Sequence, residues 1–296
     1  MTRKQESGQA LVLVLLSLAV VLTLVLFILA RSVTDVAVST SQEDSVRAFS
    51  AAEAGIENAL VIGKEGSANG SNYTANVSGY SEGSSDFPYP APLLSGDSAT
   101  TWFVAHDPTS ENIVCDQTHP CFSGSFMKVC WGNVGTYPNP QFIPAIEVSV
   151  YYETSPGDAS TAQIARAVFD PNSARLSSNS FASPDPGTCQ IGGTNYEFQK
   201  TIQFGSTGLN IPDTSYNFSN GLLFARIRMF YNTDVGQPLG TTVSGNSSPL
   251  PAQGEGIVST GTAGSSNRRI DVFQSWPESP FGGDALTSGP SLGISQ

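Results

Sequence analysis

The chain has 296 residues, of which 39% are hydrophobic and only 13% are charged, and 25 acidic against 13 basic residues give a net charge of −12. Nucleic-acid affinity depends on Lys and Arg neutralising phosphates, so we expect no nucleic-acid binding by the main body of so acidic a chain. Only two histidines are present, His106 and His119, which leaves few candidates for histidine-dependent catalysis or a multi-histidine metal site.

The N-terminal region contains an uncharged apolar segment from Ser7 to Ala30. A helix over this segment would be about 36 Å long, enough to cross the roughly 30 Å hydrocarbon core of a bilayer. Arg3 and Lys4 precede it and acidic residues dominate after it, so the positive-inside rule predicts a cytoplasmic N-terminus and an extracytoplasmic C-terminal part. A cleaved signal peptide would have a shorter apolar region, about 7–15 residues, ending at a small-x-small site. We therefore predict a retained, single-pass transmembrane helix over residues 9–31.

The next segment predicts a continuation of the same helix over residues 32–63. No proline occurs before Pro88 and no glycine lies between Gly8 and Gly55, so nothing forces a break. Larger side chains recur at steps of three and four among many alanines, at Val46, Phe49, Glu53, Ile56 and Leu60. This pattern is typical of an amphipathic helix with a small-residue surface suited to close packing. We expect the first half to lie in lipid and the second half to pack on a soluble domain.

Two motifs give this region a family resemblance. A basic leader ending in Gly8 is followed by the apolar residues Gln9-Ala10-Leu11-Val12-Leu13. The second half of the predicted helix carries Arg47-Ala48-Phe49-Ser50-Ala51-Ala52-Glu53-Ala54-Gly55. In both motifs, residues 1–62 resemble the PilX-like minor pilins of type IV pili, which share a similar entry into the helix and an "Ala-Phe-x-Ala-Ala-Glu-Ala" segment. The resemblance covers about a fifth of the chain.

The resemblance implies a leader over residues 1–8 that a prepilin peptidase removes by cutting between Gly8 and Gln9, leaving Gln9 as a methylated N-terminus. It also implies other pilin subunits and the inner pilus assembly platform as partners. Leu13 stands at the fifth position after the cut, where major pilins usually carry Glu and PilX-like proteins do not. A carboxylate in lipid is costly unless it is paired. Its absence therefore favours a minor subunit that primes or caps a filament.

The remainder of the chain reads as β-rich. Short β-branched and aromatic runs separated by Ser, Gly, Asn and Pro predict strands at Thr101–Ala105, Phe126–Trp131, Ala145–Tyr152, Gln163–Phe169, Glu197–Phe204, Leu222–Tyr231 and Arg268–Phe273. Ile146, Val148 and Val150 alternate with other residues, which predicts sheets with one wet face. The expected fold class is α+β, with a long N-terminal helix followed by an exported antiparallel sheet or sandwich over residues 64–276. We expect a long exposed loop at 170–188 and a flexible tail at 277–296.

Four cysteines, Cys115, Cys121, Cys130 and Cys189, lie on the side predicted to be exported, where disulfides can form. Three pairings are open. We favour Cys115–Cys121, which would close a turn-rich loop, together with Cys130–Cys189, which would pin the expected long loop; free thiols are the alternative if the exterior is weakly oxidising. Zinc binding by His119 with cysteines is disfavoured because the chain has no CxxC pair. We expect no metal and no cofactor.

One motif looks catalytic. Gly79-Tyr80-Ser81-Glu82-Gly83 matches G-x-S-x-G, whose chemistry requires a sharp turn from a strand into a helix. The following SSDFPYPAP cannot begin a helix promptly, so we interpret the motif as a surface turn and expect no catalytic residue. The sequence thus predicts a non-catalytic minor pilin or pseudopilin that displays a β-rich domain at the cell surface, where a surface ligand is a further expected partner. The alternative is a membrane-anchored adhesin or binding module that enters no filament.

Overall fold

The computed structural model describes residues 7–62, 66–107, 110, 112–136, 143–245 and 249–276, and the chain folds into two compact units. The first, here called the helical unit, comprises Met1–Ile62, Ser67–Asn76 and Val258–Asp271. The second, here called the sandwich unit, comprises Gly63–Gly66, Val77–Ile257 and Val272–Gln296. The α+β class expected from the sequence is confirmed, because a long apolar helix precedes a β-rich region of antiparallel sheets.

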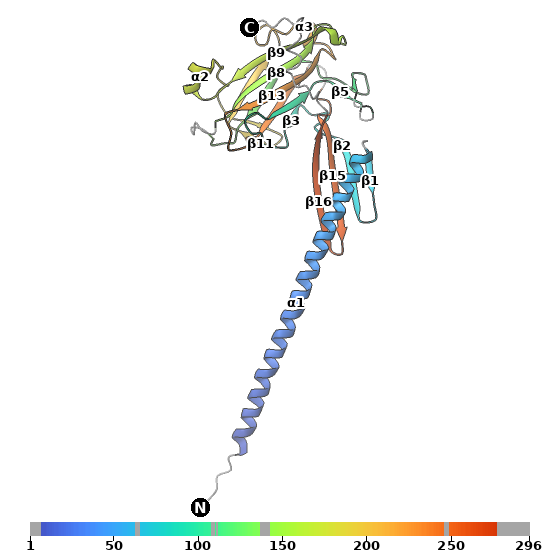
Figure 1. The fold of residues 1–296 in the computed structure, drawn as a ribbon, viewed down its shortest axis with the longest axis vertical. Helices are drawn as coiled ribbons and strands as arrows, with labels where there is room; N and C mark the ends of the chain where they lie inside the picture. The colour runs from blue at the N-terminus through green and yellow to red at the C-terminus, as the bar shows by residue number, and fades with distance from the viewer. Residues whose placement is uncertain are drawn as a thin grey trace, which may run out of the picture. The chain divides into compact units, whose positions relative to one another are not determined.

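The helical unit is built on α1 (Ser7–Ile62), an unbroken helix of 56 residues (Figure 1). It is about 84 Å long at 1.5 Å per residue. Polar side chains within it do not open the helix, because their hydroxyls donate back to carbonyls one turn earlier. Thr34 Oγ1 donates to Ala30 O and Thr40 Oγ1 to Val36 O, each at 2.9 Å.

The C-terminal part of α1 lies along a four-stranded sheet in the order β1-β2-β15-β16 (Figure 1). The strands are β1 (Gly66–Asn69), β2 (Tyr73–Gly79), β15 (Gly254–Ala263) and β16 (Ser266–Ser275). A two-residue turn joins β15 to β16, and Gly264 supplies the positive φ of +53° that such a turn needs. The sheet therefore combines strands from near the start of the β-rich region with strands from its end.

The sandwich unit contains two four-stranded antiparallel sheets. One has the order β12-β7-β14-β3 and is formed by β3 (Asp86–Pro88), β7 (Gly124–Trp131), β12 (Phe198–Gln203) and β14 (Leu239–Gly245). The other has the order β4-β13-β8-β9 and is formed by β4 (Ser98–Trp102), β8 (Ala145–Glu153), β9 (Ala162–Phe169) and β13 (Leu222–Phe230). One core cluster takes side chains from both sheets, including Val129, Trp131, Val148 and Ile227.

Smaller elements connect these strands. They are the hairpins β5 (Ala105–His106) with β6 (Ile113–Val114) and β10 (Cys189–Ile191) with β11 (Thr194–Tyr196), the helices α2 (Ser173–Asn179) and α3 (Asp213–Tyr216), and the 3-10 turn η1 (Ala159–Thr161). The predicted strands coincide with β7, β8, β9, β12, β13 and β16 to within a few residues. The predicted strand Thr101–Ala105 is instead divided between β4 and β5, because the backbone bends at Phe103 and Val104.

The expectation of a long exposed loop at 170–188 is wrong. The segment contains α2, capped by Asn172, whose side chain accepts from Ala174 N. Its first residue, Asp170, is fully buried and accepts hydrogen bonds from Arg175 Nε at 2.8 Å and Asn179 Nδ2 at 2.7 Å. Polar residues in this segment thus pair with one another, which orders it without apolar periodicity. The expected flexible tail at 277–296 lies outside the described residues.

Candidate functional site

The N-terminal half of α1 exposes a continuous apolar surface. All described side chains from residue 10 to residue 42 are exposed, and Leu13 has 67% of its surface accessible. Monomeric soluble proteins rarely expose apolar patches beyond a few hundred Å². The helix is long and apolar enough to cross a membrane, and this surface requires either lipid or other apolar helices around it.

The C-terminal half of α1 has two different faces. The face that packs on the sheet consists of small residues, with Ala48 and Ala52 fully buried and Ala59 nearly so. Val46, Phe49 and Leu60 are instead exposed. The sequence pattern correctly indicated a small-residue packing surface, but the larger apolar side chains beside it do not contribute to the core of this unit, apart from Ile56.

Glycine permits the close approach of helix and sheet. A Cβ at Gly261 of β15 would lie 2.0 Å from Ala48 O and 2.4 Å from Ala52 N. Polar contacts at the sides of the interface fix the helix further. Asn58 Nδ2 donates to the Tyr73 hydroxyl at 2.6 Å, and Arg268 Nε donates to Ser45 Oγ at 2.9 Å. The half of α1 nearest Ile62 is thereby held by its own sheet while the other half is not.

The predicted cleavage residues Gly8 and Gln9 lie in the first turn of α1. Arg3 and Lys4 of the predicted leader lie outside the described residues. Cleavage between Gly8 and Gln9 stays a prediction.

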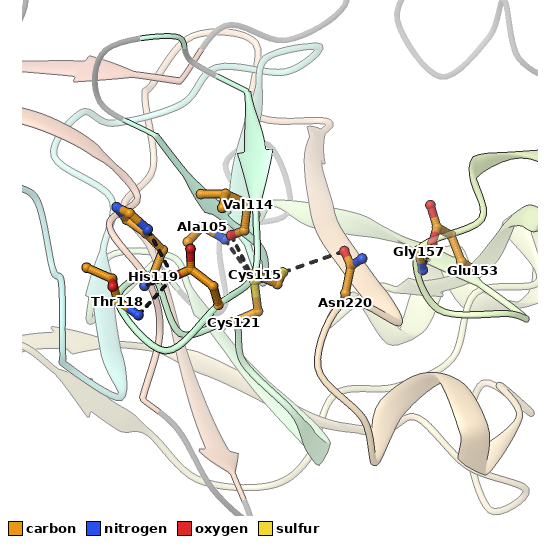
Figure 2. Close-up of a disulfide and its surroundings, with 10 residues drawn as sticks. Ala105, Val114, Cys115, Thr118, His119, Cys121, Glu153, Gly157 and Asn220 are labelled. Atoms are coloured by element: carbon orange, nitrogen blue, oxygen red, sulfur yellow. Dashed lines mark hydrogen bonds and ion pairs between the residues drawn. A yellow bond between two sulfur atoms is a disulfide. The ribbon is translucent and has the colours of Figure 1, made fainter.

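The four candidate cysteines form two disulfides, Cys115–Cys121 and Cys130–Cys189, with Cα atoms 5.3 and 6.3 Å apart. This is the pairing that the sequence analysis favoured. Figure 2 shows the first disulfide, where Ala105 N donates to Cys121 Sγ at 3.2 Å and Asn220 Oδ1 lies 3.5 Å from Cys115 Sγ. All four sulfurs are consumed in these bonds, so they offer no thiolate to a zinc ion.

The two histidines have separate structural roles. His119 lies in the loop closed by the first disulfide, and its backbone N–H donates to Asp116 Oδ1 at 2.7 Å. This bond, more than the weaker one from Thr118, holds the pKa of Asp116 below its usual range. His106 lies against Trp102 and Trp276, with ring centroids 4.5 and 5.1 Å away, and burial lowers its pKa to about 4. Neutral His106 therefore acts as a packing residue at pH 7.

The G-x-S-x-G motif forms a turn between two strands. Gly79 ends β2, residues 80–83 turn, and the chain continues into β3 rather than into a helix. Ser81 has a φ of +55°, and Tyr80 N donates to Gly254 O at 2.9 Å. The interpretation as a turn is confirmed, and the strand-to-helix geometry that activates such a serine is not formed here.

One cluster was missed by the sequence analysis. Arg166, Arg226 and Arg228 line a single pocket together with Glu147 on the β4-β13-β8-β9 sheet. The signal that could have indicated it is the alternation of Arg226 and Arg228 within a strand of an acidic chain, since residues two apart lie on one face of a sheet.

No family model matches this sequence, and no curated protein or solved structure is significantly similar to it.

Proposed function

We propose that this chain is a non-catalytic minor pilin or pseudopilin of a type IV pilus-like filament. The observation that carries the proposal is the division of α1, a single helix whose N-terminal half is apolar and fully exposed while its C-terminal half is packed on its own sheet. Such a helix suits a subunit that is stored in the bilayer and later exchanges lipid for neighbouring helices. The motifs around Gly8 and Phe49 support the same function.

The chemistry of the helix supports a minor role. In this proposal the peptidase cuts after Gly8, and the new terminal amine at Gln9 lies in an apolar environment. Leu13 offers no carboxylate to pair with the amine of an adjacent subunit, so this chain would not be the repeating subunit. It would prime or cap a filament and display its β-rich part, stabilised by disulfides that suit an oxidising exterior, outside the cell.

The N-terminus of the mature protein tests this proposal. Mass spectrometry of membrane fractions should find wild-type protein that begins at methylated Gln9. Gly8→Asp should keep the leader and still insert, because the apolar segment is unchanged. Thr2→Asp, which adds the same charge away from the cut, is the matched control and should be processed normally. A wild-type protein that begins at Met1 would instead indicate an anchored adhesin, and identical termini in wild type and Gly8→Asp would refute processing at this bond.

The abundance of the chain tests the minor role. Quantitative mass spectrometry of sheared filaments should find it far below the main subunit, and its deletion should reduce filament number. Equal abundance would contradict a minor role. Normal filaments with lost surface attachment would favour the adhesin.

A further inference from the structure

The outer face of the β4-β13-β8-β9 sheet carries a basic pocket. Strand pairing places Arg226 opposite Ser149, Ser149 opposite Arg166, and Arg228 opposite Glu147. Opposite residues, and residues two apart along a strand, lie on the same face of a sheet. The side chains of these residues, with Tyr151, line a cavity of about 150 Å³. A cavity of this volume accommodates one six-membered ring.

The strands that carry the pocket pack on the sandwich core through their opposite face. Val148, Ala225 and Ile227 alternate with the pocket residues and are fully buried in the sandwich core. A binding site on strands of a packed sheet is positioned more accurately than one on a loop. The backbone that carries the pocket residues is therefore preorganised for a ligand.

The charge of the pocket is opposite to that of the protein. Three guanidinium groups and one carboxylate line it, whereas the whole chain carries −12. Arg166 and Arg228 are exposed, and within the described part of the chain neither forms an ion pair. None of the three arginines stands opposite another, because Arg226 and Arg166 flank Ser149 and Arg228 faces Glu147. An anionic ligand would place a negative charge beside the exposed guanidinium groups of Arg166 and Arg228.

The remaining groups restrict the kind of anion. Planar guanidinium groups match a carboxylate through paired hydrogen bonds. Glu147 can only accept hydrogen bonds when ionised, and it already receives one from Ser149 Oγ at 3.1 Å. A carboxylate in the pocket repels a doubly charged ligand but can receive a hydroxyl donor. Tyr151, stacked on Phe224 with ring centroids 4.2 Å apart, adds an apolar boundary.

We propose that this pocket binds one carboxylate-bearing sugar residue, of the uronic acid class, in an anionic polysaccharide. The arginines bind its carboxylate, Glu147 accepts from a ring hydroxyl, and Tyr151 contacts the apolar edge of the ring. The proposal requires neither leader cleavage nor entry into a filament, so it stands or fails independently of the proposed function.

Calorimetric titration of the full chain in nanodiscs of neutral phosphatidylcholine tests the ligand class. The probes are trigalacturonate, neutral galactotriose and sodium sulfate at constant ionic strength. Trigalacturonate should bind, galactotriose should not, and sulfate should bind at least tenfold more weakly than trigalacturonate. Equal binding of the two sugars would refute recognition of the carboxylate. Sulfate binding as tight as that of trigalacturonate would show a general anion site and overturn the sugar assignment.

Variants test the residues. Arg166→Gln and Arg228→Gln should each weaken trigalacturonate binding about tenfold or more, because each removes charged hydrogen bonds. The matched control is Arg269→Gln, an equal charge change at an exposed arginine that pairs with Asp271 in the helical unit. It should change affinity less than about twofold. Near-ultraviolet circular dichroism verifies that each variant is folded, and wild-type affinity in both pocket variants would overturn the proposal.

Glu147 provides a readout that distinguishes a sugar site from a simple positive patch. Glu147→Gln removes a negative charge, so it should strengthen the binding of sulfate. It should weaken the binding of trigalacturonate, because an amide accepts from the ring hydroxyl less strongly than a carboxylate does. Strengthened binding of both probes would contradict the role assigned to Glu147.

Discussion

Replacing Gly261 with alanine should separate α1 from its sheet. The new Cβ would lie 2.0 Å from Ala48 O, which is 1.4 Å inside the 3.4 Å at which ordinary van der Waals contact begins. The obstructing atoms belong to helix backbone, so no side-chain rotation relieves the overlap, and helix and strand must move apart by more than an ångström. A gap of 0.5–1 Å already forfeits a quarter to a half of the dispersion energy of each contact. We expect a cost of about 3 kcal/mol, at the upper end of the range for overpacked cores.

Hydrogen–deuterium exchange measured by mass spectrometry on the full chain in nanodiscs reports this loss locally. Peptides covering residues 45–60 should exchange about a hundredfold faster in Gly261→Ala than in wild type. Gly256→Ala, in the same strand as Gly261, is the matched control. The nearest atom to its new Cβ would be Tyr80 Cδ2, at an ordinary contact distance of 3.4 Å. It should leave exchange of these peptides unchanged. Wild-type protection in Gly261→Ala would refute the close packing of α1 on β15.

Two further predictions concern the sandwich unit. Loop-closure entropy predicts that losing the Cys130–Cys189 bond, with a sequence separation of 59, costs about 4 kcal/mol, against about 2 kcal/mol for Cys115–Cys121, with a separation of 6. Urea unfolding of the two double-alanine variants should show this order, and the reverse order would contradict the entropic account. Because burial lowers the pKa of His106 to about 4, the unfolded state binds its proton first as the pH falls below 6.5, so His106 should reduce stability by about 2–3 kcal/mol at pH 4.5. The free energy of unfolding should fall less in His106→Phe than in wild type between pH 7 and pH 4.5. Equal decreases in the two proteins would show that His106 does not titrate in this window.

Local patterns in the sequence predicted the elements whose burial is regular. The helix over residues 9–62 follows from apolar composition and the lack of helix breakers. Strand β8 follows from the alternation at Ile146, Val148 and Val150, which point into the core as expected, but the predicted wet face is wrong for this strand, because Ser149 and Tyr151 on its other face are also buried. The Cys115–Cys121 bond closes a short turn-rich loop as expected, whereas the sequence left the three possible pairings open. In each case the information lies within a short stretch of chain.

Features that depend on distant residues could not be predicted in this way. Strands β2 and β15 are adjacent in one sheet, but they are rich in Gly, Ser and Thr, and their pairing joins opposite ends of the β-rich region. The arginine pocket forms only when β13 and β9 lie on either side of β8. Composition does not encode this strand order. Asp170 gave no periodic signal because its burial rests on bonds to Arg175 and Asn179. Nonlocal pairing and polar networks account for most of what was missed.

The sheet beside α1 has a consequence for the order in which the chain folds. Its strands β1 and β2 are synthesised long before β15 and β16, and most of the sandwich unit, Val77–Ile257, is an insertion between them that the end of β16, from Val272, joins again. The two ends of that insertion meet, since Tyr80 N donates to Gly254 O and Gln253 N donates to Tyr80 O, both at 2.9 Å. A contact between such distant segments forms late and slowly. The alanine face of α1 therefore stays uncovered during synthesis until β15 emerges, long after the apolar half has been made.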